Sequence, residues 1–377
     1  MTCTLAALAA GVAGCAAPSG SSVTVSGTSL TVYASAPSLP DDPQLRSDVL
    51  AAEQLAFQQG GGSQFGRFTV KLVTLGAKPS DNARKAIQDT TAIAYLGEIE
   101  PGDSDNSLGI TNAQDLLQVS PTDTALELTQ SSAAVSGSPQ SYYESLKSYG
   151  RTFARVVPST ALEAKAQAQE MEALGVKRLF VSDDGGAYGK AIALAVKQDA
   201  PPGISVVSSQ AGADAMFYGA SSDGAADRTF NAAAASNATA KLFGPSALDN
   251  DTFASALTPA AQSRTFVSAP GFLPKNLTPA GKKFVADFIA AYHHAPRPEA
   301  IFGYEAMSSV VAVLREAGST ADNRSTVVHD FFSIKNRDSV LGSYSINVNG
   351  DTSLGPFVFS RFEHSKLTPF RFVQVQG

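Results

Sequence analysis

The residues whose types and spacing could do chemistry are concentrated in residues 95–129. Two short apolar runs, 92–96 and 116–119, each end in a turn rich in Gly, Pro, Asp, Ser and Thr. This pattern predicts two strands, each followed by a turn at the carboxyl edge of a parallel sheet, where hydroxyl and backbone N–H groups bind ligands. The alternative is that these residues only cap two helices, as Ser, Thr and Asp often do.

No group of residues predicts catalysis. Ser246 lacks a G-x-S-x-G context, and the glycines at 60–62 follow a predicted helix rather than a strand, so neither a nucleophile elbow nor a phosphate loop is indicated. The four histidines lack the spacing of metal ligands: His293, His294, His329 and His364. We therefore expect a binding protein that is not an enzyme and that uses no metal and no cofactor.

Length and charge bound the class of protein. A chain of 377 residues favours two lobes, and a hydrophobic content of 44% allows each a full core. The formal net charge is −6 and no basic cluster occurs, which argues against nucleic acid as a partner.

Both cysteines, Cys3 and Cys15, lie near the start, so no disulfide can join parts of the folded body. The Val-Ala-Gly-Cys sequence that ends at Cys15 resembles a bacterial lipobox and predicts a lipoprotein signal segment over 1–15, a lipid on Cys15 and a flexible tether over 16–28. The protein would then lie on the extracytoplasmic face of the cell membrane or in the periplasm. Because no Lys or Arg precedes Arg46, either the true start lies upstream or the signal is weak; the alternative is an Ala-rich tail.

Hydrophobic periodicity predicts two successive α/β series. The first has strands at 30–34, 68–75, 92–96 and 116–119, with helices at 44–58, 80–90 and from about 103. The second has strands at 153–157, 178–181, 204–208, 215–219, 240–243 and 265–268, with helices at 161–174, after 183–189 and at 229–235. A helix is missing between 204–208 and 215–219, which are too close for an ordinary parallel crossover. Long helices at 279–293 and 298–318 follow, and strands at 343–348, 356–363 and 370–375 close the chain.

In this order, several short motifs resemble the type I periplasmic binding proteins, in the Leu/Ile/Val-binding branch of ABC-transporter solute receptors. They are Tyr95-Leu-Gly-Glu, Val119-Ser-Pro-Thr-Asp-Thr, Phe153-Ala-Arg-Val-Val-Pro, Asp183-Asp-Gly-Gly-Ala-Tyr-Gly, Leu242-Phe-Gly-Pro, Thr278-Pro-Ala-Gly-Lys-Lys-Phe, Gly303-Tyr-Glu-Ala-Met and the hairpin at 342–351. The resemblance covers nearly the whole mature chain.

The resemblance implies an α/β fold of two doubly wound, Rossmann-like lobes joined by a three-segment hinge. It places the crossings near Val156, Ser268 and Leu341, with lobe one at 29–156 plus 269–341 and lobe two at 157–268 plus 342–377. It also implies capture of a small polar solute between the lobes by hinge closure, with delivery to an ABC permease. We expect a monomer. The alternatives are a ligand sensor outside transport, or a paralogue of the same fold with a degenerate ligand site.

The resemblance also assigns ligand-binding residues. Ser120 and Thr124 match a turn that receives an amino acid's carboxylate, and Tyr188 matches a lobe-two tyrosine that covers the ligand. The serine expected in the first turn falls near Pro101, which leaves the Gly102 N–H and Ser104 as donors. The predicted set is Gly102, Ser104, Ser120, Thr122, Asp123, Thr124, Thr160, Tyr188, Tyr218 and Ser246.

The charges of this set differ from the family's pattern. Thr160 and Ser246 stand where the amino-acid binders have acids that hold an ammonium group. The lobe-one turns have instead gained acids that would repel a carboxylate if they point inward: Glu98, Glu100, Asp103, Asp105 and Asp123. The alternative is that they face solvent as helix-start residues. We predict a small polar solute, neutral or cationic, rather than a free α-amino acid, unless Arg46 pairs with an anion.

Overall fold

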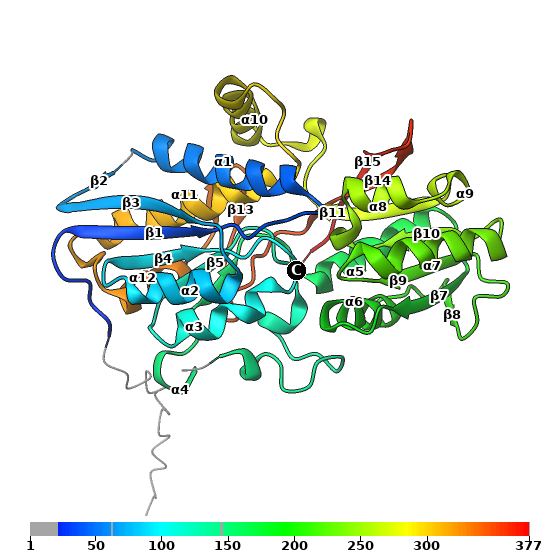
Figure 1. Cartoon of the computed structure of the whole chain (residues 1–377), viewed down its shortest axis with the longest axis horizontal. Helices are drawn as coiled ribbons and strands as arrows, with labels where there is room; N and C mark the ends of the chain where they lie inside the picture. Colours follow the sequence, from blue (N-terminus) through cyan, green and yellow to red (C-terminus); the bar gives the residue numbers. More distant parts are fainter. Residues whose placement is uncertain (1–21, 62, 144–145, 377) are drawn as a thin grey trace, which may run out of the picture.

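The structure is a computed structural model that describes residues 22–61, 63–143 and 146–376. Two sheets lie side by side, each between layers of helices, and form two lobes (Figure 1). The predicted α/β class with two doubly wound lobes is therefore confirmed. Cys15 and the rest of the predicted signal segment lie outside the described residues. Within those residues, no helix combines the length and the apolar character that a membrane-spanning segment needs.

Lobe one is built on a six-stranded sheet in the order β2-β3-β1-β4-β5-β6. All neighbours are parallel except β2 and β3. The strands are β1 (Ser29–Ser35), β2 (Gln64–Phe65), β3 (Phe68–Leu75), β4 (Ala92–Leu96), β5 (Leu117–Ser120) and β6 (Phe153–Arg155). The helices are α1 (Pro43–Gln59), α2 (Pro79–Gln88), α3 (Leu108–Asn112), α4 (Leu146–Tyr149), α10 (Pro279–Tyr292), α11 (Ala300–Ala317) and α12 (Arg324–Phe332).

Lobe two is built on a seven-stranded sheet in the order β15-β14-β11-β10-β9-β7-β8. The last two strands of the chain pair antiparallel, and β14 pairs antiparallel with β11. The strands are β7 (Arg178–Asp183), β8 (Ser205–Val207), β9 (Ala215–Gly219), β10 (Lys241–Gly244), β11 (Thr265–Pro270), β14 (Pro356–Glu363) and β15 (Lys366–Gln374). The helices are α5 (Thr160–Ala173), α6 (Ala187–Gln198), α7 (Asp223–Ser236), α8 (Asp251–Ala256) and α9 (Pro259–Gln262).

Three helices begin with a capping side chain followed by proline, a sequence that fixes a helix start. Asp42 Oδ1 accepts a hydrogen bond of 2.9 Å from Leu45 N at the start of α1. Thr258 and Thr278 cap α9 and α10 in the same way, through Ala261 N at 3.4 Å and Gly281 N at 2.8 Å. The Thr278 hydroxyl also donates to Val340 O at 2.8 Å, which ties α10 to the chain that follows α12.

Among the described residues, no helix lies between β8 and β9, as the sequence predicted. Residues 208–214 join β8 to β9, and β7 lies between these two strands in the sheet. The strand predicted at 343–348 is shorter than expected, because β13 (Gly342–Tyr344) ends early and pairs with β12 (Arg337–Ser339).

The residues after the predicted last crossing pack with lobe one. Tyr344, Ile346 and Leu354 belong to the same buried cluster as Phe302 of α11. We therefore propose that the chain leaves lobe one after Leu354, whereas the resemblance placed this crossing near Leu341. Apart from this change, the lobe boundaries stay as proposed.

Candidate functional site

Two turns at the carboxyl edge of the lobe-one sheet meet around the side chain of Asp123. The Asp123 carboxylate accepts hydrogen bonds from Gly102 N (2.7 Å), Ser104 N (2.9 Å) and Ala125 N (3.0 Å). The side chain is fully buried. Three backbone donors from two turns thus surround one carboxylate, and we call these N–H groups of Gly102, Ser104 and Ala125 the lobe-one cradle.

The predicted hydroxyl residues hold these two turns together. Ser120 Oγ donates to Glu98 O at 2.8 Å and accepts from Asp123 N at 2.8 Å. Thr122 Oγ1 donates to Ile99 O at 2.6 Å. The structure therefore brings Ser104, Ser120, Thr122 and Asp123 together as predicted, and their polar groups are bonded to one another's turns.

Arg155 holds the turn that contains Asp123 by hydrogen bonds to its backbone. Its Nη1 donates to Asp123 O (3.2 Å) and to Ala125 O (2.6 Å), and its side chain is fully buried. The guanidinium also forms an ion pair with Asp351. Sequence analysis missed this arginine, since it stands inside an apolar strand where its direction is not visible.

Lobe two contributes a buried acid that sequence analysis also missed. Glu163 Oε1 accepts from Ser246 N (2.6 Å) and Ser268 Oγ (2.7 Å), and Oε2 accepts from Ser246 Oγ (3.1 Å) and Tyr188 OH (3.4 Å). Burial raises the pKa of Glu163 to about 7, although these hydrogen bonds oppose the rise. Lobe two therefore has a carboxyl group beside Thr160 and Ser246, and not hydroxyls alone as predicted. The available sequence signal for Glu163 was its position in the first turn of α5. Acids are common at helix starts, so this position did not indicate a buried site residue.

The two lobes are in contact across this site. Thr160 Oγ1 donates to Thr124 O at 2.7 Å, and α6 packs against the short 3-10 helix at Leu126–Leu128. A Cβ on Gly102 would lie 4.0 Å from Cβ of Tyr188, so the tyrosine covers the lobe-one turn. Tyr218 does not join this group, because it packs with Met216 and Phe230 in a separate apolar cluster of lobe two.

The acids of the lobe-one turns do not share one environment. Glu98 is buried and accepts hydrogen bonds from Ser35 Oγ (2.5 Å) and Tyr95 OH (2.7 Å), and burial raises its pKa to about 7. Burial and the charge of Asp123 raise the pKa of half-buried Asp103 to about 6. Asp105 is exposed, as the solvent-facing alternative expected. That alternative is wrong for Glu98 and Asp123.

Arg46, which could have paired with an anion, is bonded to the backbone of lobe one. Its Nε donates to Ala36 O and to Pro37 O, both at 2.9 Å. In the part of the chain that the structure describes, no three His, Cys, Asp or Glu side chains gather as a metal site would require.

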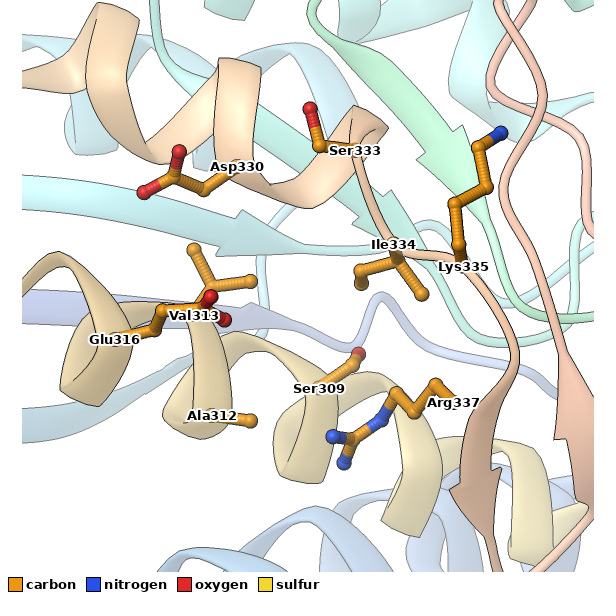
Figure 2. Close-up of a pocket in the computed structure, with 9 residues that line it drawn as sticks. All are labelled: Ser309, Ala312, Val313, Glu316, Asp330, Ser333, Ile334, Lys335 and Arg337. Carbon is orange, nitrogen blue, oxygen red and sulfur yellow. The ribbon is translucent and has the colours of Figure 1, made fainter.

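A pocket of about 290 Å³ is lined by residues of lobe one (Figure 2). It opens between α11 and α12, and Glu316, Asp330, Lys335 and Arg337 supply its charged side chains. Ile334 and Val313 line its apolar part. None of the residues predicted to bind a ligand lines this pocket, so it is separate from the candidate site.

Comparisons with known proteins agree with the fold. Residues 207–377 match the family described as periplasmic binding protein. A leucine-binding protein from Thermotoga maritima has a similar structure, with a TM-score of 0.72 at 17% identity, over 92% of this chain and 99% of that one. No curated protein matches the sequence as a relative.

Two further solved structures were determined with ligands. The branched-chain amino acid transporter substrate-binding protein of Streptococcus pneumoniae, in complex with isoleucine, gives a TM-score of 0.71 at 14% identity, over 93% of this chain and 100% of that one. An ABC-transporter solute-binding protein of R. palustris, in complex with benzoate, gives a TM-score of 0.70 at 18% identity, over 93% of this chain and 98% of that one.

Proposed function

The chain has the fold of the type I periplasmic binding proteins, and from this premise we propose that it is a solute-binding receptor of an ABC importer and not an enzyme. The observation that carries the proposal is the meeting of the lobe-one turns with Tyr188 across the lobe contact, where the Tyr188 OH donates to Glu163 of lobe two. In open α/β sheets the carboxyl ends of the strands are where ligands bind. Opening and closing about the three crossings would admit a solute there.

We infer that the solute is small and polar, and either neutral or cationic. The ligands named for similar structures, isoleucine and benzoate, each carry a carboxylate group. In this chain Asp123 already places a carboxylate on the lobe-one donors, and burial together with the charge of Asp123 raises the pKa of Asp103. Glu163 adds a carboxyl group from lobe two, and burial raises its pKa to about 7, so below that pH it is mostly uncharged. A group of acids at one site favours a positive or uncharged partner over an anion.

We propose that the protein is extracytoplasmic, is anchored to the membrane through a lipid on Cys15 and hands its solute to a permease. The lipobox supports the anchor, and the fold supports the permease. Metabolic labelling with a fatty-acid probe tests the anchor. Cys15→Ala should abolish the label, whereas Cys3→Ala is the matched control that should keep it. Equal labelling of Cys15→Ala and the wild type would disprove the anchor.

A second candidate function, a paralogue that no longer binds a solute, is favoured by one observation. Within the described residues, the four hydrogen bonds to the Glu163 carboxyl come from lobe two itself. The Asp123 carboxylate is likewise bonded within lobe one. To bind a solute, the carboxyl groups of Glu163 and Asp123 would each have to give up hydrogen bonds within their own lobe.

Thermal-shift screening of the wild-type protein against amino acids, amides, polyamines and small acids tests the proposed function. A ligand at 100 times its Kd stabilises the folded state by about 2.7 kcal/mol, which is a measurable rise in Tm. We expect such a rise with an amide or an amine. The rise should vanish in Tyr188→Ala and persist in Tyr304→Ala, a tyrosine of α11 outside the site. If no neutral or cationic solute raises Tm, the second candidate replaces the receptor.

A further inference from the structure

We propose that Asp123 is a tethered ligand: its carboxylate fills the lobe-one cradle and thereby excludes solutes that carry a carboxylate group. The inference deepens the proposed function and rests on it, because it names the chemical class that the site rejects and the residue that rejects it.

The first support is the geometry of the cradle. Asp123 Oδ1 accepts from Gly102 N at 2.7 Å and from Ala125 N at 3.0 Å, while Oδ2 accepts from Ser104 N at 2.9 Å. Gly102 and Ser104 lie about twenty residues before Asp123 in the chain, so the side chain bridges two separate turns. Every partner is a donor, which is the arrangement that binds a free carboxylate.

The second support is the way in which Asp123 is fixed. Its N–H donates to Ser120 Oγ at 2.8 Å, and its carbonyl accepts from Arg155 Nη1 at 3.2 Å. The side chain therefore starts from a backbone held at both its N–H and its carbonyl, and only the Cα–Cβ and Cβ–Cγ bonds can rotate between that backbone and the carboxylate. An attached group of this kind competes at an effective concentration above the millimolar range that flexible linkers reach. A solute carboxylate at micromolar concentration cannot displace it.

The third support is charge. The Asp123 side chain is fully buried, and its two oxygens already accept from all three donors of the cradle. A second carboxylate would add a like charge at a distance where repulsion in a poorly solvated site is strong. Exclusion therefore arises both from occupancy and from repulsion.

Two substitutions at one position test the inference. Asp123→Ala removes the carboxylate and leaves the three N–H groups without a partner, so we expect a lower Tm and a new site for a small carboxylate. Asp123→Asn is the matched control, because its amide has the same shape and still occupies the cradle, with Oδ1 accepting from Gly102 N and Ala125 N while Nδ2 faces the Ser104 N–H and loses that bond. Acetate is the first probe and formate the second. Acetamide and chloride, at the same concentration and ionic strength, control for uncharged shape and for salt.

Acetate should raise the Tm of Asp123→Ala by roughly 2 °C for each tenfold increase above its Kd. It should leave the wild type and Asp123→Asn unchanged. Acetamide and chloride should have no effect on any of the three proteins. If Asp123→Ala folds poorly, its recovery on refolding should increase with acetate and not with chloride.

Two results would overturn the inference. One is an Asp123→Ala protein whose Tm and refolding yield are both indifferent to acetate and formate. The other is saturable binding of acetate, leucine or benzoate to the wild type that is lost in Tyr188→Ala, since the cradle would then be open. Failure of the wild type to bind any amide or amine would instead count against the proposed receptor, so the two failures are distinguishable.

Discussion

Arg155 and Asp351 form a buried ion pair of 2.8 Å, which joins the first crossing between the lobes to the segment before the third. Asp351 also accepts from Thr129 Oγ1 and Gln130 Nε2, both at 2.8 Å. Burial opposes ionisation of Asp351, but the charge of Arg155 and these hydrogen bonds outweigh it and lower the pKa of the carboxyl. The pair therefore stays charged at neutral pH and fixes the base of the candidate site.

Removing one member of the Arg155–Asp351 pair should lower the stability of the fold. We expect Asp351→Ala to lower the free energy of unfolding by about 3–5 kcal/mol, because it leaves the Arg155 charge buried and unpaired. Urea unfolding followed by circular dichroism measures the change. Glu363→Ala is the control, since its pair with Arg361 is exposed and should be worth under about 1 kcal/mol. Equal losses in the two variants would contradict this account.

The stability of the protein should fall as pH rises from about 5 to 8. Burial raises the pKa of both Glu98 and Glu163 from 4.5 to about 7, so the folded state keeps two protons that the unfolded state has lost. Stability that comes from the protonated form is complete below pH 4.5 and is lost as pH rises through 7. Each acid contributes about 2–3 kcal/mol to this loss.

Thermal unfolding at pH 5, 6, 7 and 8 measures the slope. Glu163→Gln cannot ionise and should make the slope shallower, whereas Glu363→Gln, at an exposed position, should leave it unchanged. A wild-type Tm that stays constant or rises over this range would show that the two acids are ionised in the folded protein.

Close packing at Gly189, which follows Tyr188 in α6, predicts that a single added methyl group lowers the stability of the fold. A Cβ at Gly189 would lie 2.2 Å from Asp184 Oδ1 and 2.7 Å from Gly219 O, so Gly189→Ala forces α6 away from β9. We expect a loss of about 1–3 kcal/mol. Gly224→Ala is the control, because nothing lies within 4 Å of its added Cβ, and the helix α7 should gain up to about 1 kcal/mol. Similar effects at both glycines would contradict the packing argument.

The two Thr-Pro helix starts allow a graded comparison. Thr278→Ala removes the cap of α10 and the bond to Val340 O, both at 2.8 Å, and should cost about 1–2 kcal/mol. Thr258→Ala removes only a 3.4 Å cap of α9 and should cost less. Chemical denaturation of the two variants side by side measures the difference. A larger loss from Thr258→Ala would refute the ranking.

Much of the fold could be predicted from the sequence because its elements are locally determined. Ala92–Leu96 is uniformly apolar and Thr278 precedes a proline, and such patterns fix a buried strand or a helix start without help from distant residues. The third crossing could not be placed, since residues 345–354 have no regular strand or helix and their burial depends on contact with α11.

Part of the membership of the candidate site could be predicted, but the directions of its side chains could not. The turn that contains Ser120 and Asp123 was identified from its residue types. Whether Asp123 faces solvent or the Gly102 N–H depends on how closely the turn that contains Gly102 approaches it. That distance cannot be predicted from the residues next to Asp123 in the sequence. Glu163 was missed for the same reason, because an acid in the first turn of a helix looks alike whether it is exposed or buried.

The three crossings also dictate an order in which the chain can become folded as it is synthesised. Lobe one takes α11 and Leu354 into the core that contains Val32 of β1, so its first strands must wait for residues made much later. Lobe two must wait longer still, because β11 gains its antiparallel neighbour only when β14 exists. Contacts so distant in sequence form slowly. Neither lobe can therefore complete its core before the C-terminal third of the chain has been made.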